Sequence, residues 1–378
     1  MAVAAVCEFN PFHNGHKYFL ETARSLAGGP VLAVMSGSVT QRGEFAVADK
    51  FFRAEAALKN GADLVAELPA VYAAANAERF ARGGVRAAAA FGCVTHLAFG
   101  CETDDLGLLC AAADAVDDER VQKITAELMR QGDYYPRAFS SAVGRVLGES
   151  AGRVLCSPNN ILAVEYIRAL RGTGIAPLPV LRAGAAHDGE TPSGSFASAS
   201  YIRRLLRSGQ PVDKYMPCVP HEVADPKNLE RAMLFLLRRM TPRDLAQLPE
   251  VGEGLENRLA DAVKKHNSIE EIITAVKTKR YTHARIRRIL LCAALGITEE
   301  LQARHAGYVR VLGFSRDGAE MLKTCRCEAV TSVARAMQND EIRVFLEKDV
   351  LATDLCALAF DRIKPCSSDY LTKIIKTF

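Results

Sequence analysis

Short apolar runs separated by polar segments mark the first half of the chain. Four of these runs are predicted to be buried strands: Ala2–Cys7, Val31–Met35, Leu64–Glu67 and Leu97–Phe99. Most of them end in a cluster of Gly, Ser, Asn or Pro, and a stretch with helical spacing of apolar residues follows. Strands that alternate with helices predict βαβ units and a parallel, doubly wound sheet. The carboxyl ends of all the strands would then lie along one edge, where such sheets bind ligands.

The sheet region is predicted to continue to about residue 206. Leu178–Leu181 is predicted to be one more strand, and Pro179 within it indicates an edge position because proline cannot donate a ladder hydrogen bond. An alanine-rich run that ends at Ala90 is predicted to be a packed helix. A segment rich in helix breakers follows the sheet region, and its prolines are Pro211, Pro217, Pro220 and Pro226.

After this segment the apolar spacing becomes helical. The predicted helices are Leu229–Met240, Leu255–Lys265, Ile269–Val276, Ala284–Leu295 and Leu346–Ala359. The predicted organisation is therefore a Rossmann-like α/β domain over residues 1–210 and a mainly α-helical, basic domain over residues 211–378. A length of 378 residues suits two domains.

Composition adds limits on the class of protein. The chain is 49% hydrophobic and 24% charged, which is typical of a globular protein, and no apolar run is long enough for a membrane span or a secretory signal. Eleven cysteines without a Cys-x-x-Cys pair argue against a disulfide framework or a zinc ribbon, and they predict reduced thiols in the cytoplasm. The net charge of +4 permits a nucleic-acid partner but does not require one.

The strongest chemical signal follows the first predicted strand and opens the first helix. It reads Cys7-Glu8-Phe9-Asn10-Pro11-Phe12-His13-Asn14-Gly15-His16. Two histidines three positions apart lie on nearly the same helix face, and the helix start offers unpaired N–H groups and a positive dipole end. Gly15 leaves room for a nucleobase or ribose against the backbone. The pattern predicts a cradle for a triphosphate, in which His13 and His16 stabilise developing charge.

This segment resembles the H-x-G-H signature of class I aminoacyl-tRNA synthetases and small nucleotidyltransferases. Those enzymes direct an attack on the α-phosphate of ATP and expel pyrophosphate. A second signature of that superfamily is a basic loop after the last strand, and Ser198-Ala199-Ser200-Tyr201-Ile202-Arg203 stands at that place. Hydroxyl and N–H groups at a helix start, beside an arginine, form a phosphate site. An N-capped surface helix is the alternative for this segment taken alone.

Longer strings resemble the tRNA(Met) cytidine acetate ligase family. They are Met35–Glu44, Asp49-Lys50, Arg53, Asn60–Pro69, Phe99–Glu102, Ser157–Leu162, Glu165-Tyr166 and Thr278–Thr282. The resemblance implies a reaction in two steps. Acetate and ATP give acetyl-adenylate and pyrophosphate, and the acetyl group then passes to the exocyclic amine of the wobble cytidine in elongator tRNA(Met), giving N(4)-acetylcytidine.

The resemblance also implies which residues contact ATP. The expected contacts are Cys7, Glu8, Phe9, Asn10, Pro11, Phe12, His13, Asn14, Gly15, His16, Lys17, Tyr18, Phe19, Leu20, Gly100, Asn159 and Arg182, and the second signature adds Ser198 and Ser200. The expected catalytic residues are His13, His16 and Arg203, and Arg182 is expected to help Arg203 with the departing pyrophosphate. Mg²⁺ is expected with ATP because polyphosphate charge needs a cation. No metal ligands are assigned to the protein itself.

A basic segment in the second half predicts an RNA contact. Tyr281 and His283 are interleaved in it, and it contains no acid; its basic residues are Lys277, Lys279, Arg280, Arg285, Arg287 and Arg288. Basic side chains neutralise phosphates, and an aromatic ring can stack on an unpaired base. A solvated helix face is the alternative. With the family resemblance, elongator tRNA(Met) is the favoured partner, and no protein partner is implied.

Two other functions and one loop stay open. A small-molecule adenylyltransferase would share both signatures, but it has little use for a basic helical half; a non-catalytic tRNA-binding protein has no use for His13 and His16. The loop Gln41–Glu44 follows a strand end and is interpreted as holding substrate or RNA, with a solvated turn as the alternative. Asp49, Lys50 and Arg53 are equally consistent with an ordinary ion-paired helix face.

Overall fold

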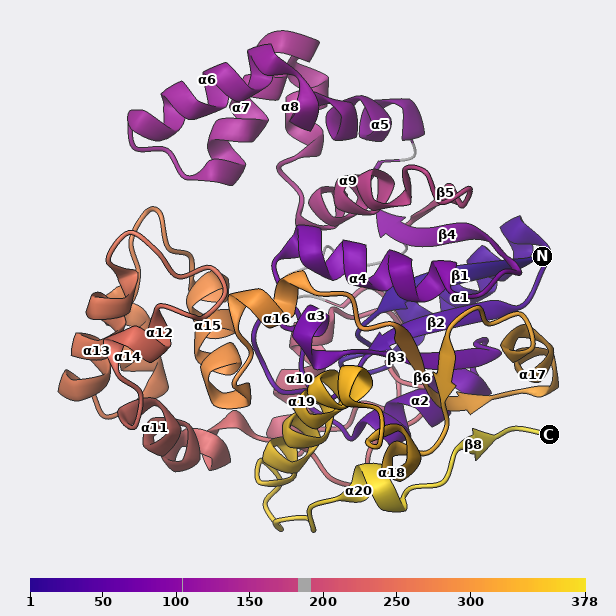
Figure 1. The fold of residues 1–378 in the computed structure, drawn as a ribbon. Coiled ribbons are helices and arrows are strands. Elements are labelled where there is room, and N and C mark those ends of the chain that lie inside the picture. Colours follow the sequence, from indigo (N-terminus) through magenta and orange to yellow (C-terminus); the bar gives the residue numbers. More distant parts are fainter. Residues whose placement is uncertain (104, 183–191) are drawn as a thin grey trace.

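The computed structural model describes residues 1–103, 105–182 and 192–378. Within these residues an eight-stranded sheet forms the centre of the molecule (Figure 1). Its strands follow the order β5-β4-β1-β2-β3-β6-β7, with β8 paired to β6. Their bounds are β1 Ala2–Cys7, β2 Val31–Ser36, β3 Leu64–Leu68, β4 Val94–Cys101, β5 Ala176–Leu181, β6 Tyr308–Phe314, β7 Glu328–Val330 and β8 Ile375–Lys376.

The first five strands are parallel to one another and confirm the predicted doubly wound α/β fold. The register pairs Cys7 with Met35 and Cys101 with Leu181, so these strands end at one edge of the sheet. The prediction of an edge position for Pro179 is confirmed, because β5 has one partner, β4.

Alternate residues of β1 explain why both faces of the sheet are covered. Ala2 and Ala4 belong to a core with α4 (Ala77–Ala89) and α9 (Pro158–Leu170). Val3 and Ala5 belong to a second core with α1 (Asn14–Ala27) and α2 (Lys50–Lys59). A strand that is buried on both faces needs the continuous apolar run by which it was predicted. The alanine-rich segment is the helix α4, as predicted.

A helical insertion interrupts the connection between β4 and α9. It consists of α5 (Leu106–Asp114), a 3₁₀ turn (Ala115–Asp117), α6 (Glu119–Arg130), α7 (Tyr135–Leu147) and α8 (Glu149–Val154). Figure 1 shows these helices at the top, beyond the layer formed by α9 and α4. The crossover between the two parallel strands needs only α9, so the insertion is extra to the sheet fold.

After β5 the chain forms α10 (Ala199–Arg207), and residues 211–225 then contain no helix or strand. A helical unit with its own core follows, at the left of Figure 1. Its elements are α11 (Glu230–Arg238), α12 (Pro242–Leu245), α13 (Leu255–Lys265), α14 (Ile269–Val276) and α15 (His283–Leu295). A 3₁₀ turn (Pro226–Leu229) precedes the unit and α16 (Glu299–Ala303) follows it, and Leu229 and Leu301 pack in the core of the sheet domain. The helices predicted over residues 229–295 are therefore present, with α13 and α14 at the predicted bounds.

The last part of the chain returns to the sheet, which the sequence analysis did not predict. β6 pairs antiparallel with β3, and β7 and β8 pair with β6. The helices here are α17 (Arg316–Leu322), α18 (Val333–Ala336), α19 (Asp340–Ala357) and α20 (Ser368–Leu371), and α19 packs on α3 (Ala70–Ala73). Arg310 interrupts the apolar run of β6, and β7 and β8 are too short to give a strand pattern, which explains the omission.

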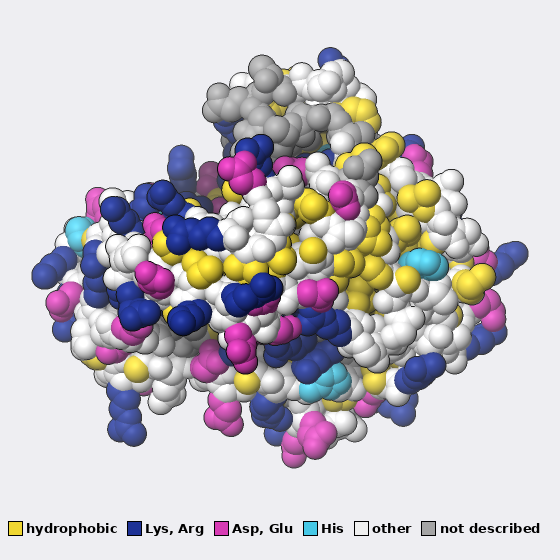
Figure 2. Space-filling model, turned by 90° about the horizontal axis from the view of Figure 1, so that it is seen from above, with side chains coloured by type: hydrophobic (Ala, Val, Ile, Leu, Met, Phe, Trp, Pro, Cys, Tyr) yellow, Lys and Arg dark blue, Asp and Glu magenta, His cyan; other side chains and the backbone are white. Residues whose placement is uncertain are grey.

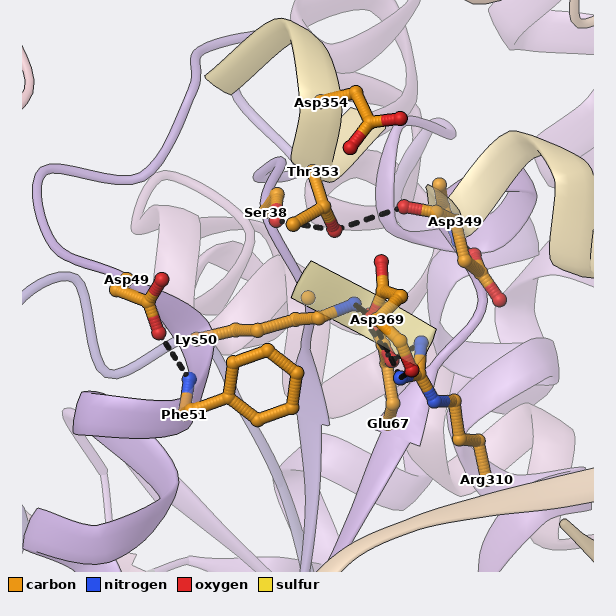
Figure 3. Close-up of polar contacts among 12 residues, drawn as sticks. Ser38, Asp49, Lys50, Phe51, Glu67, Arg310, Asp349, Thr353, Asp354 and Asp369 are labelled. Atoms are coloured by element: carbon orange, nitrogen blue, oxygen red, sulfur yellow. Dashed lines mark hydrogen bonds and ion pairs between the residues drawn. The ribbon is translucent and has the colours of Figure 1, made fainter. Parts of the chain in front are cut away.

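Four buried charges join this returning segment to the sheet (Figure 3). Lys50 at the start of α2 contacts Glu67 of β3 at 2.8 Å and Asp369 of α20 at 2.7 Å. Arg310 of β6 contacts Glu67 at 2.9 Å and Asp369 at 2.5 Å. We call Lys50, Glu67, Arg310 and Asp369 the ionic quartet. Lys50 is ion-paired, as the alternative of an ion-paired helix face has it, but Lys50 and Arg53 both lie in the interior of the protein.

Two further observations concern the chain as a whole. No helix within residues 1–103, 105–182 and 192–378 is both long and apolar enough to cross a lipid bilayer. All eleven cysteines lie in the described residues and are free thiols.

Replacing Lys50 tests the ionic quartet. Lys50→Met leaves Glu67 and Asp369 with one cation between them, and we expect a loss of about 3–5 kcal/mol in the free energy of unfolding, measured by urea denaturation. Lys59→Met is the matched control on the same helix, because Lys59 is 57% exposed and pairs only with Glu55; its effect should stay within about 0.5 kcal/mol. Equal effects of the two substitutions would contradict the assignment.

Candidate active site

A cavity of about 430 Å³ lies at the carboxyl edge of β1, β4 and β5. The parts of the chain around it are the loop after β1 with the start of α1, the loop after β2, the start of α4, the ends of β4 and β5, the start of α9, and the start of α10. Parallel α/β sheets bind ligands at this edge, so the cavity lies where the strand order predicts a site. We call it the nucleotide cavity.

Most of the residues expected to contact ATP line this cavity. They are Cys7, Glu8, Phe9, Asn10, His13, Gly15, His16, Tyr18, Phe19, Gly100, Asn159, Arg182 and Ser200, and Arg203 lines it too. Pro11, Phe12, Asn14, Lys17, Leu20 and Ser198 do not line it. Several of these have structural contacts instead: Asn14 donates to the carbonyls of Ser195 and Lys214, and the Ser198 hydroxyl caps α10.

The two histidines form the start of α1. Nδ1 of His13 accepts the Gly15 N–H at 3.1 Å, and Nδ1 of His16 accepts the His13 N–H at 3.3 Å. The rings are stacked with their centroids 3.7 Å apart. A nitrogen that accepts a hydrogen bond carries no proton, so the proton of each neutral ring lies on Nε2. Each histidine therefore keeps one N–H donor that the helix cap does not use, and the ring of His16 also interacts with the Pro11 carbonyl.

Both imidazoles are neutral at physiological pH. Burial, with smaller contributions from Arg182 and Arg203, lowers the pKa of His13 to about 3. Burial, the His13 ring and Arg182 lower the pKa of His16 well below its ordinary value. The histidines can thus act as neutral hydrogen-bond donors to phosphate oxygens, and the positive charge of the site comes from the arginines.

The arginines Arg182 and Arg203 are fixed by neighbours at the cavity wall. Arg203 donates to the carbonyl of Asn10 at 2.8 Å, and burial lowers the pKa of its guanidinium. Arg182 follows β5 and donates to Oδ1 of Asn159 at 3.4 Å, and Asn159 in turn donates to Glu102 at 2.9 Å. Two guanidinium groups, one directly after β5 and one in α10, therefore stand at the cavity wall in reach of a polyphosphate.

Glycines 15 and 100 have different roles from each other. A Cβ on Gly15 would come within 2.9 Å of the His13 ring, so the glycine permits His13 to fold back over the helix start. A Cβ on Gly100 would meet only the Cγ of Arg182, at 3.7 Å, and would project into the cavity wall. Gly15 thus permits the histidine geometry and also lines the cavity, whereas Gly100 leaves open space in the cavity wall.

A buried arginine behind the cavity holds the ends of β1 and β2. The guanidinium of Arg53 donates to the carbonyls of Glu8 (2.6 Å), Ser36 (3.1 Å) and Gly37, and Nε donates to Ala48. Its side chain is fully buried and does not line the nucleotide cavity. Arg53 therefore positions the backbone from which Glu8 and the loop after β2 reach the site.

The loop Gln41–Glu44 connects the nucleotide cavity with the basic helix α15. The Gln41 N–H donates to Oε1 of Glu8 at 2.6 Å, and Glu44 forms an ion pair with Arg287 at 3.1 Å. Gly43 has φ 77°, and a Cβ there would lie 2.4 Å from the backbone N of Arg288. The loop therefore packs against α15 so closely that only glycine fits, which is not the arrangement of a solvated turn.

A larger groove of about 1,050 Å³ lies between the helical insertion and the helices α12–α15. Gln41, Ala77 and Ile161 line both this groove and the nucleotide cavity, so the two hollows adjoin. We call the larger one the interhelical groove. A third cavity, of about 550 Å³, shares Asp133, Tyr134 and Thr282 with it.

Five of the six predicted RNA-binding residues line these hollows. Arg280, Arg285 and Arg288 line the interhelical groove, and Lys277 and Lys279 line the third cavity. Arg287 lines neither and pairs with Glu44 and Glu270, while Arg288 is buried in an ion pair with Glu250. Figure 2 shows the upper face of the molecule, where Lys and Arg side chains gather towards the left with Asp and Glu between them.

The sequence analysis missed the apolar walls of the nucleotide cavity. Phe80, Phe99 and Tyr166 line it together with Phe196 and Leu162. A planar base fits between such side chains. Tyr166 and Leu162 stand in strings that the family resemblance singled out, which was the available signal, whereas Phe80 and Phe196 carry no local pattern.

Comparisons with known proteins agree with this geometry. Residues 1–369 match the model of the HIGH nucleotidyl transferase family. The chain thus belongs to the HIGH nucleotidyltransferases, the class that the paired histidines at a strand-end helix define. Within this class it belongs to the tRNA(Met) cytidine acetate ligase family, as the following relatives show.

The tRNA(Met) cytidine acetate ligase of Thermoanaerobacter sp. strain X514 is 36% identical, over 98% of each chain. That of Syntrophotalea carbinolica is 39% identical, over 88% of this chain and 85% of its own. The apo crystal structure of Thermotoga maritima TmcAL superposes with a TM-score of 0.90 at 29% identity, over 99% of both chains. The same protein bound with alpha-thio ATP gives a TM-score of 0.89 at 29% identity over the full length of both. The family resemblance is confirmed.

The low pKa of His13 predicts a pH dependence of stability. The unfolded chain takes up a proton at this histidine near pH 6.5, and the folded protein does so only near pH 3, so its contribution to stability is lost as the pH falls through 6.5. His13→Asn keeps a side-chain acceptor for the helix cap and removes the titration. Between pH 7.5 and 5 its free energy of unfolding should fall by about 2 kcal/mol less than that of the wild type. Equal decreases, measured by urea denaturation, would contradict the assignment.

Proposed function

We propose that this protein activates acetate with ATP and acetylates the wobble cytidine of elongator tRNA(Met), giving N(4)-acetylcytidine. The observation that carries the proposal is the junction of two hollows. A nucleotide cavity with paired histidines and two arginines shares Gln41, Ala77 and Ile161 with a groove edged by basic residues. A nucleobase held in the groove can therefore reach an intermediate formed in the cavity. The names of the relatives, which are cytidine acetate ligases, support the same reaction.

In the first step an acetate oxygen attacks the α-phosphorus of ATP. The bond to the bridging oxygen breaks, and pyrophosphate leaves with its electron pair. The Nε2–H groups of His13 and His16 donate to oxygens of the phosphate under attack, and Arg182 and Arg203 neutralise the charge that moves to pyrophosphate. No protein nucleophile is needed, because positioning and electrostatics supply the catalysis.

In the second step the N4 amine of cytidine attacks the acetyl carbonyl of acetyl-adenylate. The bond from the carbonyl carbon to the phosphate oxygen breaks, AMP leaves, and the amine loses one proton. The cytidine must leave its stack to reach the intermediate, and an anticodon base is unpaired, so this costs less than it would in a duplex. The proposed division of labour assigns ATP to residues 1–210 and tRNA to residues 211–378.

Mg²⁺ is proposed as the companion of ATP rather than as a resident of the protein. In the described part of the chain, no three His, Cys, Asp or Glu side chains are grouped to hold a metal ion. Mg²⁺ keeps most of its water and binds through substrate phosphates, so a dedicated cage is not required. We propose a cytoplasmic location, because the tRNA substrate is found there and the eleven thiols are free.

Acetate-dependent exchange of labelled pyrophosphate into ATP tests the first step. We expect exchange with acetate and none without acid, because pyrophosphate returns to ATP only from an acyl-adenylate. Other short acids and tRNA(Met) complete the set of conditions. Exchange with a different acceptor would favour the small-molecule adenylyltransferase, and no exchange under any condition, with retained tRNA affinity, would favour a non-catalytic tRNA-binding protein.

Two arginines on α10 give a matched test of the site. Arg203 lines the cavity, whereas the adjacent Arg204 is exposed and stacks on Tyr201. We expect Arg203→Ala to lower the exchange rate by about a hundredfold or more, and Arg204→Ala to leave it nearly unchanged. His16→Asn keeps an acceptor for the His13 N–H but loses the Nε2–H donor, and a similar loss is expected. Full activity of Arg203→Ala or His16→Asn would remove that residue from the mechanism.

A further inference from the structure

The proposed assignment of ATP to residues 1–210 and of tRNA to residues 211–378 gives the helical insertion (α5–α8) no function of its own. It adds nothing to the sheet, but it lines the interhelical groove, which adjoins the nucleotide cavity. Its α6–α7 turn forms one wall of the interhelical groove, with Met129, Arg130, Asp133, Tyr134 and Tyr135. The opposite wall is the predicted RNA-binding segment, with Arg280, Tyr281 and Arg285.

The α6–α7 turn also faces the basic segment in the third cavity. In the cavity of about 550 Å³, Gln131–Tyr134 and Arg137 stand opposite Lys277–Lys279, Thr282 and His283. The two hollows share Asp133 and Tyr134 on one side and Thr282 on the other. A ligand that follows the basic segment along both hollows therefore meets the α6–α7 turn throughout.

The chemistry of the turn suits unpaired nucleotides. Tyr134 is 38% and Tyr135 50% exposed, and the Tyr135 ring is stacked on Phe139, which holds it in place. Arg130 is exposed, and Arg137 has a side chain that is 68% exposed with only a loose 3.6 Å ion pair to Asp133. Aromatic rings beside arginines stack bases and neutralise phosphates without reading sequence.

The carboxylates that line the interhelical groove do not exclude a nucleic-acid ligand. Each acid that lines the interhelical groove pairs with an arginine: Glu78 with Arg82, Asp133 with Arg137, Glu165 with Arg168, Glu250 with Arg288, Glu253 with Arg280 and Glu299 with Arg79. Their negative charge is thereby locally compensated. The pairs Asp133–Arg137 and Glu253–Arg280 are exposed, and exposed pairs are worth little, so an incoming phosphate can take either arginine at small cost.

We propose that the α6–α7 turn is a second RNA-binding wall, which grips the loop nucleotides beside the acceptor cytidine through Tyr134, Arg130 and Arg137. This inference rests on the proposed function, and it adds the partner surface that the basic segment alone does not supply. The RNA loop lies between the insertion and α15, and its acceptor base points past Gln41 towards the nucleotide cavity.

Two substitutions test the wall. Tyr134→Ala removes a stacking ring without loss of a cap, because the Tyr134 side chain makes no capping bond. We expect it to raise the Kd for a tRNA(Met) transcript about tenfold or more. Arg137→Glu should raise the Kd similarly and reduce the slope of log K against log salt concentration by about 1. Both should leave acetate-dependent pyrophosphate exchange at the wild-type rate, since neither residue lines the nucleotide cavity.

Arg153→Glu is the matched control for charge. Arg153 lies in the same insertion, its side chain is 78% exposed, and it pairs with Glu149 at the i,i+4 spacing at which Arg137 pairs with Asp133. It lines none of the three hollows. The two reversals change the net charge equally, so an effect confined to Arg137→Glu reports contact with the RNA rather than general repulsion.

The possible outcomes separate clearly. Wild-type tRNA affinity in both Tyr134→Ala and Arg137→Glu would overturn the proposal and leave the turn to a protein partner or to none. Equal weakening by Arg137→Glu and Arg153→Glu would overturn it as well. If the wild type shows no acetate-dependent exchange, the proposed function fails, but the binding measurements still decide whether the wall contacts RNA.

Discussion

The guanidinium of Arg53 occupies the point at which the first two strands end. It is fully buried and donates to the carbonyls of Glu8, Ser36, Gly37 and Ala48. A hydrogen bond to a charged group contributes about 1.5–3 kcal/mol, and a buried carbonyl without a partner costs a comparable amount. The loops after β1 and β2, which carry Glu8 and Gln41, therefore depend on one side chain that never touches the nucleotide cavity.

Charge is distributed in the site according to burial. The stacked histidines are neutral because they lie in a desolvated helix start beside Arg182 and Arg203. The arginines keep their charge in the same surroundings, since a guanidinium is hardly ever deprotonated in proteins. The helix cap itself selects the tautomer, because it consumes Nδ1 of both rings. When α1 folds, its cap therefore also fixes both rings in the tautomer that carries the proton on Nε2.

The first five strands and the histidine motif depend on local sequence, and local sequence patterns predicted them well. The strands β1 and β2 are nearly continuous apolar runs because α/β crossovers bury them on both faces, and the histidine motif is contiguous. β6 was missed because Arg310 breaks its apolar run, and only the pairing with Glu67 across the sheet explains that arginine. The burial of Lys50 could not be predicted either, since a lysine is almost always exposed unless paired and its partners lie far away in sequence. The α6–α7 wall is likewise a product of tertiary arrangement.

The two ends of the helical insertion are tied together where they leave the sheet. Asn159 donates to the Glu102 carboxylate, and the Glu102 N–H donates to Oδ1 of Asn160, each at 2.9 Å. The two ends of the insertion therefore lie next to each other, and the length of the insertion does not affect the pairing of β4 with β5. Such a segment is a module in the evolutionary sense. It can lengthen, shorten or be exchanged for another while the nucleotide chemistry stays as it is, and under the proposed role of the α6–α7 turn such a change would adapt the protein to a differently shaped RNA.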